Sequence, residues 1–202
     1  VVENMNLPNK ITVSRIILAI IMIVLLLIPD GSLGFTWPKY AVNDEFISLQ
    51  YIIAGIIFVV ASLTDFVDGK LARKYNIVTD FGKVADAIAD KVLVNGLLVV
   101  LACNGNIYPV IAVIIIIRDI IVDSLKMLSG NHGKVVAASF TGKAKTMCMM
   151  IGLTLVMFKN IPFCFINLPV AELLVIVATI LSVISGCQYY YNTKEFLFPK
   201  EK

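Results

Sequence analysis

Long apolar segments alternate with short polar ones along this chain of 202 residues. Six apolar runs stand out, at positions 11–28, 47–63, 92–103, 107–121, 147–158 and 168–184. Several are shorter than the roughly 20 residues that a helix needs to cross a bilayer. They reach that length if the adjoining charged segments continue the same helices. The pattern predicts an all-α, polytopic membrane protein with about six transmembrane helices and a short N-terminal amphipathic segment.

The composition supports this class, because 59% of the residues are hydrophobic and only 15% are charged. The net charge is +3, and no basic block interleaves with aromatic residues, so nucleic-acid binding is not expected. The four cysteines form no CxxC pair and the chain has a single histidine, which argues against a zinc site. We expect free thiols, although Cys103 and Cys164 would lie near the same membrane face. We expect one domain over 1–202.

The basic residues indicate an orientation. With the N-terminus inside, the outer loops would be 29–46, the turn around Gly105, and 159–167. Only Lys39 and Lys159 of all the basic residues fall in these loops. The positive-inside rule therefore predicts a multi-pass protein of the cell membrane with both termini in the cytoplasm.

The segment "TDFVDGKLARKYNIVTDFGKVADAIADK" (64–91) places five aspartates between two apolar runs. Asp65 and Asp68 share one helix face, and Asp86 and Asp90 share a face of the next helix. Two adjacent antiparallel helices would direct these four carboxylates at a common point. Oxygen ligands alone favour Mg²⁺ or Mn²⁺, and the ligand number suits two divalent cations. Salt bridges on a solvated connection are the alternative, which intramembrane placement disfavours.

Small residues lie on the same faces as these carboxylates. Gly69, Ala72 and Gly82 remove side-chain bulk, so a substrate could approach the backbone there. Arg73 offers a fork suited to phosphate oxygens. Together with divalent cations, this set predicts a diphosphate-bearing substrate and displacement at phosphorus.

The spacing Asp-x-x-Asp-Gly-x-x-Ala-Arg, eight residues, then Gly-x-x-x-Asp-x-x-x-Asp runs from Asp65 to Asp90. It resembles the signature of the CDP-alcohol phosphotransferase family, and "NLPNKITVSR", the segment around Arg118 and "GKAKT" extend the resemblance. The resemblance implies a six-helix, homodimeric membrane enzyme of phospholipid biosynthesis. It would transfer the phosphatidyl group of CDP-diacylglycerol to sn-glycerol 3-phosphate, releasing CMP.

The resemblance also implies residue roles. The metal ligands would be Asp65, Asp68, Asp86 and Asp90. Asp90 would also be the catalytic base that takes the proton of the acceptor hydroxyl. The CDP groove would be lined by Thr64, Asp68, Gly69, Ala72, Arg73 and Gly82.

An acceptor that carries its own phosphate needs a cationic pocket. Arg118 ends an apolar run, and Lys143 and Lys145 begin the fifth predicted helix, so all three could face one inner cavity. For Lys145, snorkelling to the membrane interface is an equally good explanation. Thr12 and Arg15 of the first helix are further candidates for this cavity.

Some positions depart from the pattern of members that make phosphatidylglycerophosphate. Ala87 replaces a usual proline, Asp119 replaces a glutamate, Lys126 stands near the place of an arginine, and Asp123 is an extra acid. The acceptor could therefore be phosphatidylglycerol, an inositol phosphate or serine instead, although Arg118 and Lys143 favour a phosphorylated one. An intramembrane prenyltransferase or a cation transporter is a more remote alternative. A transporter would explain the carboxylates but not Arg73 or the adjacent glycines.

Overall fold

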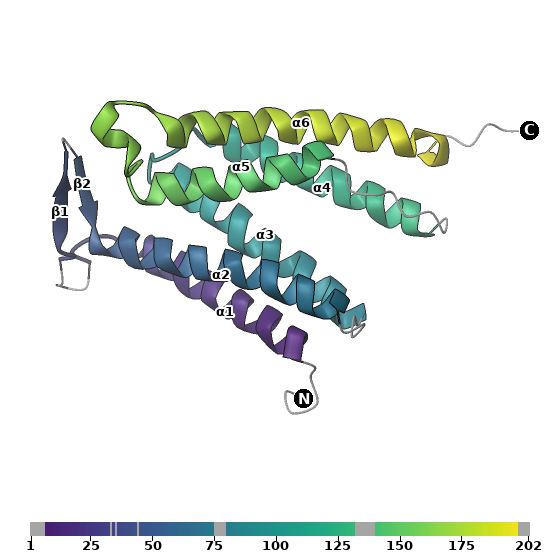
Figure 1. The fold of residues 1–202 in the computed structure, drawn as a ribbon, viewed down its shortest axis with the longest axis horizontal. Helices are drawn as coiled ribbons and strands as arrows, with labels where there is room; N and C mark the ends of the chain where they lie inside the picture. The colour runs from purple at the N-terminus through teal and green to yellow at the C-terminus, as the bar shows by residue number, and fades with distance from the viewer. Residues whose placement is uncertain are drawn as a thin grey trace, which may run out of the picture.

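The computed structural model describes residues 7–32, 34, 36–43, 45–74, 80–131 and 140–197. This part of the chain forms a helical bundle with a small hairpin at one end (Figure 1). Its helices are α1 (Leu7–Leu27), α2 (Leu49–Lys74), α3 (Asp80–Cys103), α4 (Pro109–Asn131), α5 (Phe140–Met157) and α6 (Val170–Leu197), with a 3-10 turn, η1 (Phe163–Ile166), before α6.

The charged segments continue the apolar helices, as predicted. The second apolar run extends through the signature segment to Lys74, and α3 begins at Asp80, ahead of the third run. Pro8 lies in the first turn of α1, where a missing N–H removes no intrahelical hydrogen bond. The part of the predicted amphipathic segment before Leu7 lies outside the described residues.

The hairpin corrects the all-α prediction, since we expected only a loop between the first two helices. Strand β1 (Lys39–Val42) pairs antiparallel with β2 (Glu45–Ser48), and Lys39 lies opposite Ser48. The segments "KYAV" and "EFIS" contain the aromatic and β-branched residues that favour strands. At the turn, Asn43 has a φ of 53°, a left-handed conformation that asparagine tolerates.

An ion pair closes the loop that leads into the hairpin. The Asp30 carboxylate lies 2.8 Å from the Lys39 ammonium and accepts a hydrogen bond of 3.0 Å from the backbone N–H of Trp37. The hydrogen bond from Lys39, followed by that from Trp37, holds the pKa of Asp30 below its usual range.

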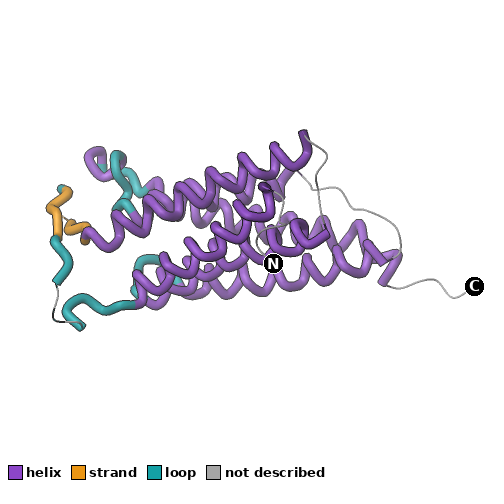
Figure 2. The backbone as a smooth tube through the Cα atoms, turned by 90° about the horizontal axis from the view of Figure 1, so that it is seen from below, coloured by secondary structure: helices purple, strands orange, loops and turns teal. Residues whose placement is uncertain are grey.

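The helices pack in two groups joined through α3. Helix α1 packs against α2 and α3, whereas α6 packs against α4 and α5. Figure 1 shows α1 and α2 on one side of the bundle and α5 and α6 on the other. Buried side chains of both groups, including Met22, Phe58, Leu97 and Leu153, form a continuous core. The strands lie at one end of the bundle, and the C-terminus lies at the other (Figure 2).

Helices α5 and α6 approach closely at Gly152. A Cβ atom on this residue would lie 2.9 Å from Cγ2 of Val175 and 3.2 Å from its backbone nitrogen. The position therefore requires a residue without a side chain, as is common where membrane helices pack closely.

Two described helices, Asn9–Leu27 and Val170–Lys194, are long and apolar enough to cross a bilayer, and Leu49–Asp65 is a shorter apolar helix. Large hydrophobic side chains are also exposed on other helices, for example Ile117 and Ile120 of α4. Soluble monomers rarely expose so much apolar surface, so the surface fits a membrane protein. The four cysteines are free, as expected.

Candidate active site

Three of the four predicted metal ligands converge at one point between α2 and α3. Asp65 lies in the last third of α2, and Asp86 and Asp90 lie one turn apart on α3. Each offers a carboxylate oxygen, and these three oxygens lie within 4.8 Å of one another. The spacing of four residues between Asp86 and Asp90 thus places both on the face of α3 that meets Asp65.

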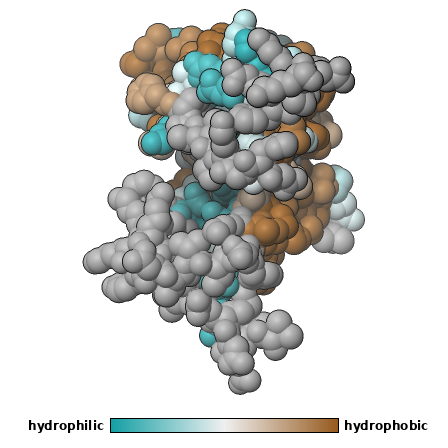
Figure 3. All heavy atoms as spheres, turned by 90° about the vertical axis from the view of Figure 1, so that its right-hand side faces the viewer, coloured by the Kyte–Doolittle hydropathy of each residue, from teal (hydrophilic) through white to brown (hydrophobic). Residues whose placement is uncertain are grey.

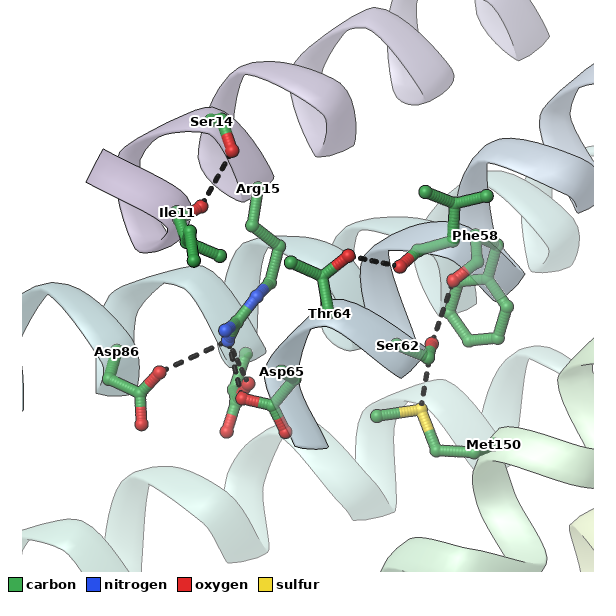
Figure 4. A network of polar contacts seen from close by, with 11 residues as sticks. Ile11, Ser14, Arg15, Phe58, Ser62, Thr64, Asp65, Asp86 and Met150 are labelled. Carbon is green, nitrogen blue, oxygen red and sulfur yellow. Dashed lines mark hydrogen bonds and ion pairs between the residues drawn. The ribbon is translucent and has the colours of Figure 1, made fainter. Parts of the chain in front are cut away.

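Arg15 of α1 occupies the centre of this carboxylate cluster (Figure 4). Its Nη1 atom lies 2.5 Å from Oδ1 of Asp65, 3.1 Å from Oδ1 of Asp86 and 3.3 Å from Oδ1 of Asp90. The arginine side chain has no solvent exposure, whereas those of the aspartates are about a third to a half exposed. One nitrogen therefore joins three helices, since the aspartates come from α2 and α3.

This arrangement constrains the charge balance. A guanidinium remains protonated in proteins, so Arg15 holds one positive charge against three carboxylates. Arg15 is fully buried, so loss of its partners would leave its charge uncompensated. Each single contact to an aspartate that is a third to a half exposed is screened by solvent. Arg15 therefore stabilises the convergence of the carboxylates as well as the packing of α1.

The remaining signature residues are only partly described. The side chains of Asp68, Gly69, Ala72 and Arg73 lie outside the described part of the structure, so their roles stay predictions. The hydroxyl of Thr64 donates a 2.6 Å hydrogen bond to the Val60 carbonyl of its own helix. Gly82, a half-buried residue, lies one turn before Asp86 on α3, as the motif requires.

Next to the carboxylate cluster is a cavity of about 520 Å³ between α3, α4, α5 and α6, which we call the basic cavity. Its charged lining residues are Asp90, Lys91, Arg118, Asp119, Asp123, Lys126, Lys143 and Lys145. Five cations thus face three carboxylates, which favours an anionic ligand. Seen from the right-hand end of Figure 1, one of several hydrophilic areas lies between the upper and lower parts of the bundle (Figure 3).

Arg118 and Lys145 share Asp119 in the wall of the basic cavity. The Asp119 carboxylate accepts hydrogen bonds of 2.9 Å from Arg118 and 2.8 Å from Lys145. Arg118 also donates to the Ser182 carbonyl at 2.9 Å and to the Ser185 hydroxyl at 2.5 Å, both on α6. Lys145 is buried, and its ammonium is paired with Asp119 in the wall of the cavity. Asp119, which we noted only as a departure from the family pattern, orients both predicted cations.

A second group of cations surrounds Asp123. Its carboxylate contacts the ammonium groups of Lys91 and, at 3.6 Å, Lys126. Lys126 also lies over the Tyr189 ring, 5.5 Å from its centroid. We did not predict Lys91 and Tyr189 as site residues, although Lys91 immediately follows the last motif aspartate. Lys143 lines the cavity and makes no ion pair within the described part of the chain.

Neither of the two candidates from α1 lines the basic cavity. Thr12 is buried and does not line the basic cavity, and Arg15 lies at the carboxylates instead. The reason is packing: α1 contacts α2 and α3, whereas the basic cavity is bounded by α3 to α6. Thr12 and Arg15 therefore do not line the cavity with Arg118, Lys143 and Lys145, although Arg15 contacts Asp90, which does.

Asp90 lies where the carboxylate cluster meets the basic cavity. It belongs to the carboxylate cluster and also lines the basic cavity. A carboxylate in this place can accept a proton from a hydroxyl group held in the cavity while it remains part of the carboxylate cluster.

Comparison with known proteins agrees with this geometry. The family model for CDP-alcohol phosphatidyltransferase matches residues 5–184. A Bacillus subtilis protein named CDP-diacylglycerol–glycerol-3-phosphate 3-phosphatidyltransferase is 40% identical over 193 residues, covering 95% of this chain and 97% of the relative. Proteins of the same name from Rickettsia felis (30% identical, 95% of this chain, 97% of the relative) and Mycoplasma genitalium (37% identical, 73% of this chain, 63% of the relative) also match. The chain belongs to the CDP-alcohol phosphatidyltransferase family.

Proposed function

We propose that this enzyme transfers the phosphatidyl group of CDP-diacylglycerol to sn-glycerol 3-phosphate, forming phosphatidylglycerophosphate and CMP. The observation that carries the proposal is the position of Asp90, which borders both the carboxylate cluster and the basic cavity. The names of the three relatives contain the same pair of substrates.

The residues of the carboxylate cluster fit divalent cations. Three carboxylates with oxygens within 4.8 Å of one another form the oxygen-only donor set that Mg²⁺ and Mn²⁺ prefer. Asp68 is the proposed fourth ligand, which would complete a site for two cations. When bound, the cations would neutralise the diphosphate and stabilise charge that develops during displacement.

The chain's own residues would bind the acceptor and accept its proton. The basic cavity would bind the phosphate of the acceptor through Lys143, which forms no ion pair with the residues that the structure describes, and through Arg118 and Lys145, which Asp119 orients. Asp90 would accept the proton of the acceptor hydroxyl as that oxygen bonds to the phosphorus carrying diacylglycerol. The bond from this phosphorus to the bridging oxygen of the diphosphate breaks, and CMP leaves with that oxygen.

The nucleotide would lie along the faces of α2 and α3 that carry the signature. We assign Thr64, Asp68, Gly69, Ala72, Arg73 and Gly82 to its binding, on the strength of the motif. Helix propensity does not explain the two glycines at these positions, whereas close approach of a substrate to the backbone does.

We further propose that 1–202 forms one domain with six membrane spans, as a homodimer, with both termini and the active site on the cytoplasmic side. The exposed apolar side chains around the bundle and the distribution of lysine and arginine support this placement. CDP-diacylglycerol would enter from the bilayer, and sn-glycerol 3-phosphate from the cytoplasm.

The test is CMP release by the purified protein with CDP-diacylglycerol, Mg²⁺ or Mn²⁺, and one alcohol at a time. The panel would contain sn-glycerol 3-phosphate, glycerol, phosphatidylglycerol, serine and an inositol phosphate. We expect release only with sn-glycerol 3-phosphate and none after chelation of the metal. A preference for another alcohol would refute the acceptor assignment, and full activity in EDTA would refute the metal site.

A further inference from the structure

The position of Arg15 has a consequence for metal binding. A single guanidinium nitrogen lies 2.5–3.3 Å from an oxygen of each of Asp65, Asp86 and Asp90. These are the same three carboxylates that offer oxygens to a cation. A divalent cation would bind these oxygens at about 2.0–2.6 Å. It could not share them with the guanidinium nitrogen, because two positive groups would then lie within a few ångströms of each other.

The carboxylates cannot be left without a cation either. Three of them converge beside a bundle whose outer surface is apolar, and a cluster of like charges in such a place is destabilising. Arg15 supplies the compensating charge, and its burial in α1 against α2 and α3 keeps it there.

We propose that Arg15 is the built-in counter-cation of the metal-free site and that it leaves the carboxylate cluster when a divalent cation binds. The inference rests on the metal site of the proposed function. In the absence of metal, Arg15 holds α1, α2 and α3 together, so the fold does not depend on the metal. In its presence, Arg15 competes for the ligands and so raises the metal concentration that the protein needs.

The first experiment measures Mn²⁺ binding to purified protein without nucleotide or lipid substrate, from the electron paramagnetic resonance signal of free Mn²⁺. We expect Arg15→Met to bind Mn²⁺ about tenfold or more tightly than the wild type, because a competing charge has been removed. Arg15→Lys keeps the charge and should bind less tightly than Arg15→Met. The control Lys10→Met removes an exposed positive charge from the same helix and should leave affinity unchanged.

The same variants give a second measurement, the melting temperature. In EDTA, Arg15→Met should melt below the wild type, and Mn²⁺ should raise its melting temperature more than that of the wild type. Equal or weaker Mn²⁺ binding by Arg15→Met would overturn the inference while leaving the metal site intact. Absence of Mn²⁺ binding by the wild type and all variants would instead overturn the metal site of the proposed function.

A measurement on the wild type alone covers the case in which Arg15→Met fails to fold. Phenylglyoxal modifies accessible arginines, and peptide mass spectrometry can distinguish Arg15 from the two other arginines of the chain, Arg73 and Arg118. Arg15 is fully buried against the carboxylates, so we expect slow modification in EDTA and faster modification in saturating Mn²⁺. Unchanged protection in Mn²⁺ would overturn the displacement.

Discussion

Asp90→Asn separates catalysis from folding, because the substitution keeps the shape of the side chain and removes only its charge. Among the three contacts to Arg15, that of Asp90 is the longest at 3.3 Å, and its side chain is 49% exposed. An ion pair this exposed is worth about 1 kcal/mol or less, and Arg15 keeps Asp65 and Asp86 as partners. The loss of stability should therefore be small.

The loss of activity should be much larger. A general base typically contributes about 10²–10⁴-fold to the rate, which corresponds to about 3–5 kcal/mol in the activation free energy. We expect kcat for CMP release, measured at saturating metal and substrates, to fall by this factor, with the KM for CDP-diacylglycerol little changed.

The assay pairs CMP release with thermal unfolding followed by circular dichroism. Asp30→Asn is the matched control, because it makes the same chemical change in the loop before the hairpin, away from the carboxylate cluster. A kcat within about threefold of the wild type would contradict the role of Asp90, since a base worth 10²-fold or more would be missing. A large fall in melting temperature would mean that the lost activity reports unfolding instead.

Three further predictions follow from other contacts. Lys143→Met should raise the KM for sn-glycerol 3-phosphate by about tenfold or more, because one charged hydrogen bond to the substrate is lost. The melting temperature should not change. An unchanged KM would exclude this lysine from acceptor binding. Gly152→Ala should destabilise the protein by about 1–3 kcal/mol in thermal unfolding, because the new methyl group meets α6, whereas the control Gly130→Ala has open space and should not. Asp30 has a lowered pKa, so its contribution to loop stability is present above its unfolded-state pKa and is lost as the pH falls through the folded-state value. Fluorescence of Trp37, the only tryptophan in the chain, should therefore change at a pH below the usual range for aspartate in the wild type and show no such transition in Asp30→Asn.

The comparison between sequence and structure is clearest for the aspartates. Their spacing of four residues placed Asp86 and Asp90 on one helix face, and the structure brings this face to Asp65. The prediction succeeded because helical periodicity is a local property, set by 3.6 residues per turn. The extension of the apolar helices through the charged segments succeeded for the same reason.

The hairpin was missed because its strands are only four residues long and lie beside an apolar run. The alternation of so few residues does not distinguish a strand from a loop or a helix end. The hydrophobic pattern does not show which residues pair, whereas the structure pairs Lys39 with Ser48.

The sequence by itself determined the family signature, the helical class and the set of charged residues available to a site. Only the tertiary structure decided which charges meet: Arg15 joins the carboxylate cluster rather than the basic cavity, Asp119 orients Arg118 and Lys145, and Asp90 borders both features. The physical reason is that helical periodicity fixes which residues share a face of one helix. The packing of whole helices decides which face of a neighbouring helix lies opposite that face. This packing depends on contacts between residues far apart in the chain.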